Sequence, residues 1–200
     1  MYGVLGEDKS DVATLKVLFR RLAHDELVSI KTKGYSGSGE MLKKGGKQLK
    51  LFAKFGCNCL IVCYDSDNEE PENRYQEVVK RIIKKSGLTG LKKEIICILI
   101  PFQEIEAWIL ADIEAVTHIF KNWHPKPISN PESIDSPKEY LEKLSRDAKK
   151  RPRYNHATHN EKVAQYLDLD KVLQKCPSFN PLVELVESDI GNFPPNKKQF

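Results

Sequence analysis

The chain has 200 residues, enough for one domain of ordinary size with a proper hydrophobic core. Its composition is 40% hydrophobic and 30% charged, with a formal net charge of +4, which excludes a disordered chain and indicates a globular, slightly basic protein. No apolar run approaches the roughly eighteen residues of a membrane span, and Met1 leads into a strand-like segment rather than a signal peptide. The five cysteines lie mostly in or beside apolar runs, so we expect reduced thiols and a cytoplasmic location.

Strand-like and helix-like segments alternate through the first half of the chain. Short apolar segments bounded by turn residues predict strands over residues 2–5, 27–31, 60–64 and 95–100. Helical spacing of apolar residues predicts helices between them over residues 12–22, 41–55 and 74–86. The last two strands are continuously apolar, which is typical of a sheet covered on both faces. We therefore predict an α/β, Rossmann-like fold with a mainly parallel four-stranded sheet and helices on both faces.

Two local features refine the predicted helices. Ser10 or Asp11 is well placed to cap the first helix. The Gly45-Gly46 pair is expected to fray or interrupt the first turns of the second helix.

The pattern changes after residue 115. An irregular stretch over residues 118–137 precedes predicted helices over residues 137–150, 161–173 and 181–187. We expect residues 1–115 to form the α/β core and residues 116–200 to form a helical C-terminal extension packed on that core.

Acidic side chains follow three of the predicted strands. Glu7 follows the first strand, Asp65 and Asp67 follow the third, and Glu104 and Glu106 lie just beyond the fourth. Because ligands of open parallel sheets bind at the carboxyl ends of the strands, we expect these acids to share one edge. Carboxylates placed this close repel one another unless a cation neutralises them, and Mg²⁺ or Mn²⁺ prefers oxygen ligands.

Each of these acids also has a simpler interpretation. Asp65-x-Asp67 alone reads best as a turn cap, and the acids after the other strands are what favour a metal site. Glu104 could be a surface acid, and Glu106 could cap a helix or pair with a lysine.

Three stretches of the sequence resemble a TOPRIM domain, which topoisomerases, bacterial primases and OLD-type nucleases share. They are Gly6-Glu7-x-x-x-Asp11, the glycine-bearing loop 34–39, and Asp65-x-Asp67 after an apolar strand. The stretches "PFQEIEAWILAD", "SPKEYLEKL" and "CPSFNPLVELV" resemble, more closely, an uncharacterised TOPRIM-like family of the domain of unknown function 4276 type. This resemblance covers most of the chain and implies a TOPRIM-like core.

The resemblance also implies roles for particular residues. In OLD-type nucleases, a Glu after the first strand, an acid four residues later, an Asp-x-Asp pair and a later acid hold two metal ions. The matching residues here are Glu7, Asp11, Asp65, Asp67 and either Glu106 or Glu104. Those enzymes also use a downstream lysine, for which Lys162 is the candidate.

The activity that the resemblance implies is Mg²⁺- or Mn²⁺-dependent hydrolysis of phosphodiester bonds in DNA or RNA by a metal-activated water. The chain has no ATPase motif, so the resemblance implies a separately encoded ATPase of the OLD or ABC type, in a bacterial anti-phage defence system. It leaves a homodimer open.

Basic side chains suggest where a nucleic acid would bind. The densest patch runs from the second strand into the second helix, from Lys31 to Lys54, and includes Lys33, Lys43, Lys44, Lys47 and Lys50. Two interpretations of this patch are equally good: a solvated surface and a surface that binds phosphates. His156-x-x-His159 could bind zinc, but no cysteine pair at ligand spacing accompanies it. The alternative function is a non-catalytic subunit that binds nucleic acid or a partner protein through the same fold.

Overall fold

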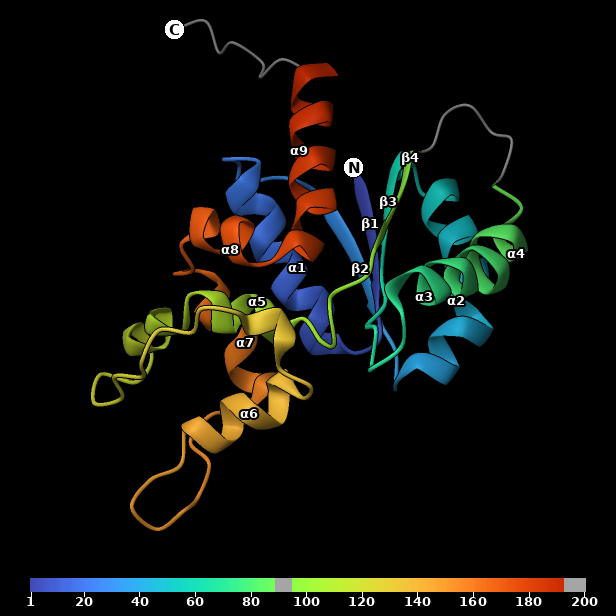
Figure 1. Cartoon of the computed structure of the whole chain (residues 1–200). Helices are drawn as coiled ribbons and strands as arrows, with labels where there is room; N and C mark the ends of the chain where they lie inside the picture. Colours follow the sequence, from blue (N-terminus) through green and yellow to red (C-terminus); the bar gives the residue numbers. More distant parts are fainter. Residues whose placement is uncertain (89–94, 193–200) are drawn as a thin grey trace, which may run out of the picture.

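Four parallel strands form the centre of the protein, in the order β2-β1-β3-β4 (Figure 1). The computed structural model describes residues 1–88 and 95–192, with side chains through residue 188. The strands are β1 (Tyr2–Gly6), β2 (Ile30–Gly34), β3 (Cys59–Cys63) and β4 (Ile95–Leu99). Within the described residues, β2 and β4 form the two edges of the sheet.

Alternating side chains of the strands face two separate hydrophobic clusters. On β3, Cys59, Ile61 and Cys63 face one cluster, and Leu60 and Val62 face the other. Helix α1 (Lys9–Leu22) packs on the first face, and α2 (Ser38–Lys54) packs on the second. A continuous helical segment beside α2 comprises α3 (Pro71–Val78), the π-helical turn η1 (Val79–Ile83) and α4 (Lys84–Ser86). The predicted Rossmann-like α/β fold is confirmed.

The C-terminal part is helical and covers the face of the sheet that carries α1 (Figure 1). Its α-helices are α5 (Glu106–Ala111), α6 (Pro137–Leu144), α7 (His156–Ala164), α8 (Leu169–Lys175) and α9 (Asn180–Asn192). Its 3-10 turns are η2 (Ile113–His118), η3 (Pro131–Ser133) and η4 (Pro177–Phe179). Trp108 of α5 is fully buried, and its Nε1 donates a hydrogen bond to Ser178 Oγ (2.8 Å).

One hydrophobic cluster includes side chains of the sheet, α1 and these C-terminal helices. Residues 193–200 of the predicted extension lie outside the described residues, and the boundary at residue 115 stays a prediction. Within residues 1–88 and 95–192, no helix has the length and apolar character needed to cross a bilayer.

Some predicted boundaries differ from the structure. The N-cap of α1 is Asp8, and Asp11 completes a capping box with it. The second strand begins at Ile30 rather than Leu27, whose side chain is 87% exposed. The region predicted as one helix over residues 161–173 contains the end of α7 and most of α8. Helix α6 ends at Leu144, six residues before the predicted end.

The prediction that the glycine pair interrupts α2 was wrong. Gly45 and Gly46 lie within a continuous helix. A Cβ added to Gly46 would lie 2.7 Å from the carbonyl oxygen of Ile82, so only glycine lets α2 approach η1 this closely. Packing against the neighbouring helix therefore offsets the low helix propensity of the pair.

Candidate active site

The carboxyl ends of β1 and β3 lie side by side where the strand order reverses. From β1 the chain continues to β2 on one side, and β3 and β4 lie on the other. Open α/β sheets bind ligands at such a switch point. Glu7 follows β1 directly and Asp65 follows β3, and the Oε1 atom of Glu7 accepts a hydrogen bond from the Asp65 N–H (3.0 Å).

Two more carboxylates join them from different elements. Asp11 lies in the first turn of α1, where its Oδ2 accepts the Asp8 N–H (2.9 Å). Glu106 begins α5 and is 1% exposed. Its Oε1 accepts a hydrogen bond from Asn160 Nδ2 (3.0 Å), and its buried Oε2 has no hydrogen-bond partner among the described residues. We call Glu7, Asp11, Asp65 and Glu106 the carboxylate cluster.

The members of the cluster interact electrostatically. Burial, followed by the charges of Asp11, Glu7 and Glu106, raises the pKa of Asp65 well above its usual value. The pKa of each of the other three members is raised to about 7, and burial is the largest cause in every case. Without a cation, the folded protein therefore holds protons in the cluster more tightly than an unfolded chain would.

The structure places the other predicted acids around the cluster. Asp67 is exposed and has a positive φ of 46°. Its charge still raises the pKa of Glu7, behind burial as the main cause, so it lies near the cluster. Oε2 of Glu104 accepts the N–H of Lys138 (2.9 Å), and Oε1 of Glu104 forms an ion pair with Lys138 Nζ (3.2 Å). Glu104 is thus a partly buried, paired acid beside the cluster.

Lys138, at the start of α6, was not among the residues singled out from the sequence. The pKa of Lys138 is raised above its usual value. Burial alone would lower it, but this is outweighed by the nearby acids: the charge of Glu106, the charge and hydrogen bond of Glu104, and the charge of Asp65. Its own charge lowers the pKa values of Asp11 and Glu106. Lys162 is exposed on α7, beside His159, whose pKa is lowered first by burial and also by the charge of Lys162. Lys138 belongs to the stretch "SPKEYLEKL", but its contact with Glu104 and its charge beside Glu106 depend on the packing of α6 against α5, which the sequence does not show.

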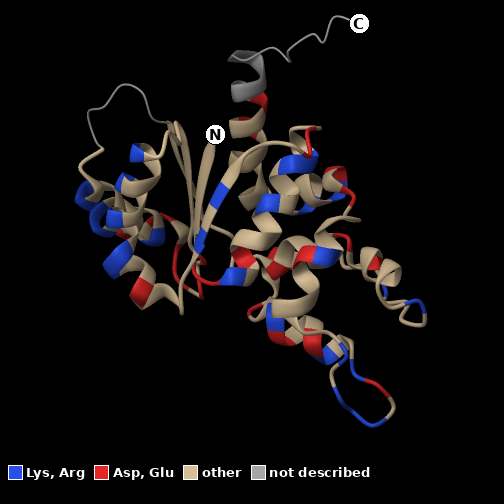
Figure 2. Ribbon diagram, turned by 180° about the vertical axis from the view of Figure 1, so that it is seen from behind, with Lys and Arg blue, Asp and Glu red and all other residues tan. Residues whose placement is uncertain are grey.

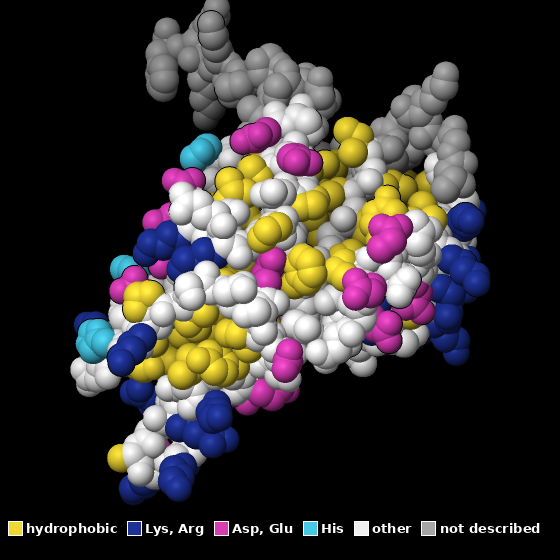
Figure 3. Space-filling view, viewed as in Figure 1, with side chains coloured by type: hydrophobic (Ala, Val, Ile, Leu, Met, Phe, Trp, Pro, Cys, Tyr) yellow, Lys and Arg dark blue, Asp and Glu magenta, His cyan; other side chains and the backbone are white. Residues whose placement is uncertain are grey.

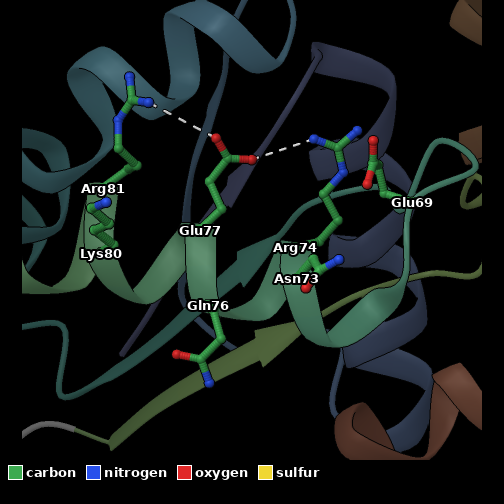
Figure 4. Close-up of a pocket in the computed structure, with 7 residues that line it drawn as sticks. All are labelled: Glu69, Asn73, Arg74, Gln76, Glu77, Lys80 and Arg81. Carbon is green, nitrogen blue, oxygen red and sulfur yellow. Dashed lines mark hydrogen bonds and ion pairs between the residues drawn. The ribbon is translucent and has the colours of Figure 1, made fainter.

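Arg74 of α3 supplies a second cation beside the cluster. Its guanidinium lies over the ring of Tyr64, donates to the Ser66 carbonyl (3.1 Å), and lies 4.0 Å from a carboxylate oxygen of Asp67. Figure 4 shows Arg74 in a pocket of about 430 Å³, pointing toward Glu77, which also pairs with Arg81. Arg74 therefore connects the loop after β3 to α3.

The loops that carry the acids are fixed by backbone hydrogen bonds. The Ser66 N–H donates to the Pro101 carbonyl, and Ser66 Oγ accepts the Gln103 N–H (2.7 Å). Asp67, Asn68 and Gln103 all have φ between 46° and 64°, a left-handed conformation that non-glycine residues seldom adopt. The loops after β3 and β4 thus hold each other in a constrained arrangement, as is common at functional sites.

The carboxylate cluster matches a hard divalent cation in the type of its ligand atoms. All its donors are oxygens, and Glu106 Oε2 lacks a partner that a cation would supply. The side chains of the cluster are not arranged as a set of metal ligands. Among the described residues, no three Asp, Glu, His or Cys side chains are grouped so that they could hold a metal ion. Glu7 and Asp11 each use one oxygen for a backbone N–H, so the second oxygen of each carboxylate is the one that would bind an ion.

Comparison with known proteins identifies the family of the chain. The family described as "Domain of unknown function (DUF4276)" matches residues 7–187, which include every member of the carboxylate cluster. Comparisons with curated proteins and with solved structures give no match. The chain therefore belongs to the DUF4276 family.

Proposed function

We propose that the protein is a Mg²⁺- or Mn²⁺-dependent nuclease that hydrolyses phosphodiester bonds of DNA or RNA at the carboxylate cluster. One observation carries the proposal: the buried carboxylates of Asp11, Asp65 and Glu106 and the partly buried Glu7 come from separate elements and lie around the switch point of the sheet, and Glu106 Oε2 has no partner among the described residues. Burying mutually repelling acids is unfavourable, and a divalent cation is the ligand that would reverse that cost.

The protein side chains have distinct proposed roles. Glu7, Asp11, Asp65 and Glu106 would hold the cation, with Asp67 at the exposed rim. Bound Mg²⁺ or Mn²⁺ would supply the charge that activates a water and stabilises phosphoryl oxygens. Lys138 and Arg74 are positioning residues: Lys138 balances the charge of Glu106 and Glu104, and Arg74 orients the loop that carries Asp67.

The remaining parts of the proposal rest on the resemblance to OLD-type nucleases. They are the TOPRIM relationship itself, a cytoplasmic role in bacterial anti-phage defence, and a separately encoded ATPase partner. The parallel sheet and the position of Glu7 and Asp65 after adjacent strands are compatible with that relationship.

A cleavage assay tests the activity. Labelled single-stranded and double-stranded DNA and RNA would be incubated with the protein, alone and with a candidate ATPase partner, in Mg²⁺, Mn²⁺ or EDTA. We expect metal-dependent cleavage that Asp65→Asn and Glu106→Gln abolish. Glu161→Gln removes an exposed acid of α7 and should leave cleavage unchanged. Cleavage that persists in EDTA or in both cluster variants would refute the proposal.

A second candidate function is supported by the side-chain positions. Glu7, Asp11 and Glu106 already accept hydrogen bonds from protein N–H groups, as they would in a non-catalytic binding subunit. In that case Asp65→Asn would leave every function intact, and it would strengthen binding of a polyanion by removing negative charge.

A further inference from the structure

A basic groove lies on the opposite side of β1 from Asp65. Its volume is about 490 Å³, and it runs between the edge strand β2 and helix α2. Its basic lining residues are Lys33, Lys44, Lys47, Lys50 and Lys54. Figure 2 shows Lys and Arg positions on β2 and on the layer of α2, α3 and α4, and Figure 3 shows Lys and Arg side chains at the edge of that helical layer. Lys43, which belongs to the same basic stretch of sequence, is not part of the lining.

The positive charge of this groove is largely uncompensated. No acidic residue lines it, and within the described residues only Lys44 of its five lysines forms an ion pair, with Glu40. At the strand ends and on the C-terminal helices, by contrast, Asp and Glu positions lie among the Lys and Arg positions (Figure 2). An anionic ligand would therefore gain attraction here without displacing a protein carboxylate, except at Lys44.

The groove also contains aromatic and apolar side chains. Tyr35 is 7% exposed, and its buried hydroxyl has no hydrogen-bond partner in the part of the chain that the structure describes. The Nζ of Lys33 lies 5.3 Å from the centre of its ring. Leu51 also lines the groove and is 40% exposed, and Phe55 at the end of α2 is 55% exposed with Lys31 Nζ over its ring. The surface thus alternates cationic and apolar contacts, as surfaces that bind single-stranded nucleic acid do.

The groove leads toward the carboxylate cluster. β2 pairs with β1 in register, with Gly34 opposite Gly6, so the carboxyl end of β2 lies beside Glu7. Gly34 has no room for a side chain because the backbone of Asp8 occupies that space. The Gly37 N–H, just before α2, donates to the Glu7 carbonyl (3.0 Å). Lys44 to Lys54 extends away from this end along α2 for about 15 Å.

We propose that the groove binds single-stranded nucleic acid, with backbone phosphates on the lysines and a base or sugar over Leu51. The Tyr35 hydroxyl would donate to a phosphate oxygen. A duplex keeps its bases paired inside the helix, so it would not offer a base to Leu51. Binding of a strand in the groove is independent of the proposed nuclease function. Continuation of that strand into the carboxylate cluster rests on the proposed function.

The test measures binding in EDTA, where no cleavage occurs. Fluorescence anisotropy would follow short labelled oligothymidylate, oligouridylate and a matched duplex at about 50 to 200 mM salt. For Lys47→Gln with Lys50→Gln, we expect at least tenfold weaker binding of the single strand. The salt slope should decrease by about 1.4, because each lost phosphate contact contributes about 0.7 on a single strand. The DNA and RNA strands show whether the 2′-hydroxyl matters.

Two controls make the test specific. Lys149→Gln with Lys150→Gln removes the same charge from an exposed loop and should leave the affinity within twofold of the original. Leu51→Ser should weaken binding of the oligonucleotide but not of inorganic polyphosphate, and its salt slope should stay unchanged. The proposal is overturned if both lysine pairs have equal effects, if the duplex binds more tightly than the strand, or if Leu51→Ser has no selective effect.

The two proposals can fail separately. A protein that binds single strands through the groove but cuts nothing in Mn²⁺ refutes only the nuclease function. A protein that cuts in Mn²⁺ with a KM insensitive to Lys47→Gln and Lys50→Gln refutes only the groove.

Discussion

Asn160 of α7 donates a hydrogen bond from Nδ2 to the Oε1 atom of Glu106 over 3.0 Å, although 54 residues separate them in the sequence. Asn160 is fully buried, and its Oδ1 accepts a hydrogen bond from the hydroxyl of Tyr154 (2.7 Å). The bond from Asn160 holds Oε1 of Glu106 in place and so sets the direction of Oε2. Glu106 is therefore oriented by α7 and not by its own helix α5 alone.

Replacing Asn160 should affect both stability and metal affinity. Asn160→Ala leaves Glu106 Oε1 and the Tyr154 hydroxyl unpaired, so we expect a loss of about 1–3 kcal/mol in the free energy of unfolding. We also expect Mn²⁺ to bind at least tenfold more weakly, because Glu106 is no longer oriented. Tyr154→Phe is the matched control: it should lower stability in urea unfolding but leave the Mn²⁺ affinity, measured by calorimetry, nearly unchanged. Equal losses of affinity would contradict an orienting role.

Stability should fall as the pH rises. The folded-state pKa values of Glu7, Asp11 and Glu106 are about 7, above their ordinary values of 4.5, 3.8 and 4.5. Groups with raised pKa values contribute stability that is complete below the unfolded-state pKa and is lost as the pH rises through the folded-state pKa. Without metal, we expect urea unfolding to show a loss of at least about 2 kcal/mol between about pH 5 and about pH 8. A stability that increases over this range would show that the cluster is not protonated.

Divalent cations should stabilise the folded protein. At a concentration a hundred times the dissociation constant, a ligand contributes about 2.7 kcal/mol, which is roughly 5–10 °C in the melting temperature for a chain of this size. Asp65→Asn should raise the melting temperature without metal, since it removes repulsion with Glu7, Asp11 and Glu106. It should also remove the response to Mn²⁺. A full Mn²⁺ response in Asp65→Asn would place the ion elsewhere.

Two lysines can be compared directly. Lys138→Met removes the charge that lowers the pKa values of Glu106 and Asp11, so it should destabilise the protein at pH 8 by roughly 2 kcal/mol. It should also reduce cleavage. Lys162→Met, at an exposed position on α7, should change stability by less than about 0.5 kcal/mol. Thermal unfolding measures the stability of the two variants, and initial rates measure their cleavage. Loss of cleavage in Lys162→Met, but not in Lys138→Met, would support the catalytic role predicted for Lys162.

The sequence indicated the sheet and the local acids more reliably than it indicated their partners. Continuous apolar strands and the strand-end positions of Glu7 and Asp65 depend on neighbouring residues, so periodicity and spacing suffice to find them. Lys138, Asn160 and Tyr35 depend on packing between distant elements. The hydroxyl of Tyr35 and the bond from Asn160 to Glu106 have no local pattern, so only the fold brings them to notice.

The second strand shows a different limit. Leu27 to Lys31 fits a strand by composition, but Leu27 is exposed and the β-structure begins only at Ile30. The register with β1 pairs Ile30 with Tyr2, the first residue of β1, so β2 begins where its partner strand begins. Tertiary contacts, which a propensity does not contain, therefore set this boundary.

The central claim is that the carboxylate cluster holds a divalent cation, and Mn²⁺ binding measured by electron paramagnetic resonance tests it most directly. At pH 7 we predict saturable binding by the original protein, with release of protons, because the cation replaces those held by Glu7, Asp11 and Glu106. Asp65→Asn with Glu106→Gln should abolish this binding, whereas Glu161→Gln should retain it. Saturable binding that is unchanged in the cluster variant, or no saturable binding in any of these proteins, would contradict the claim.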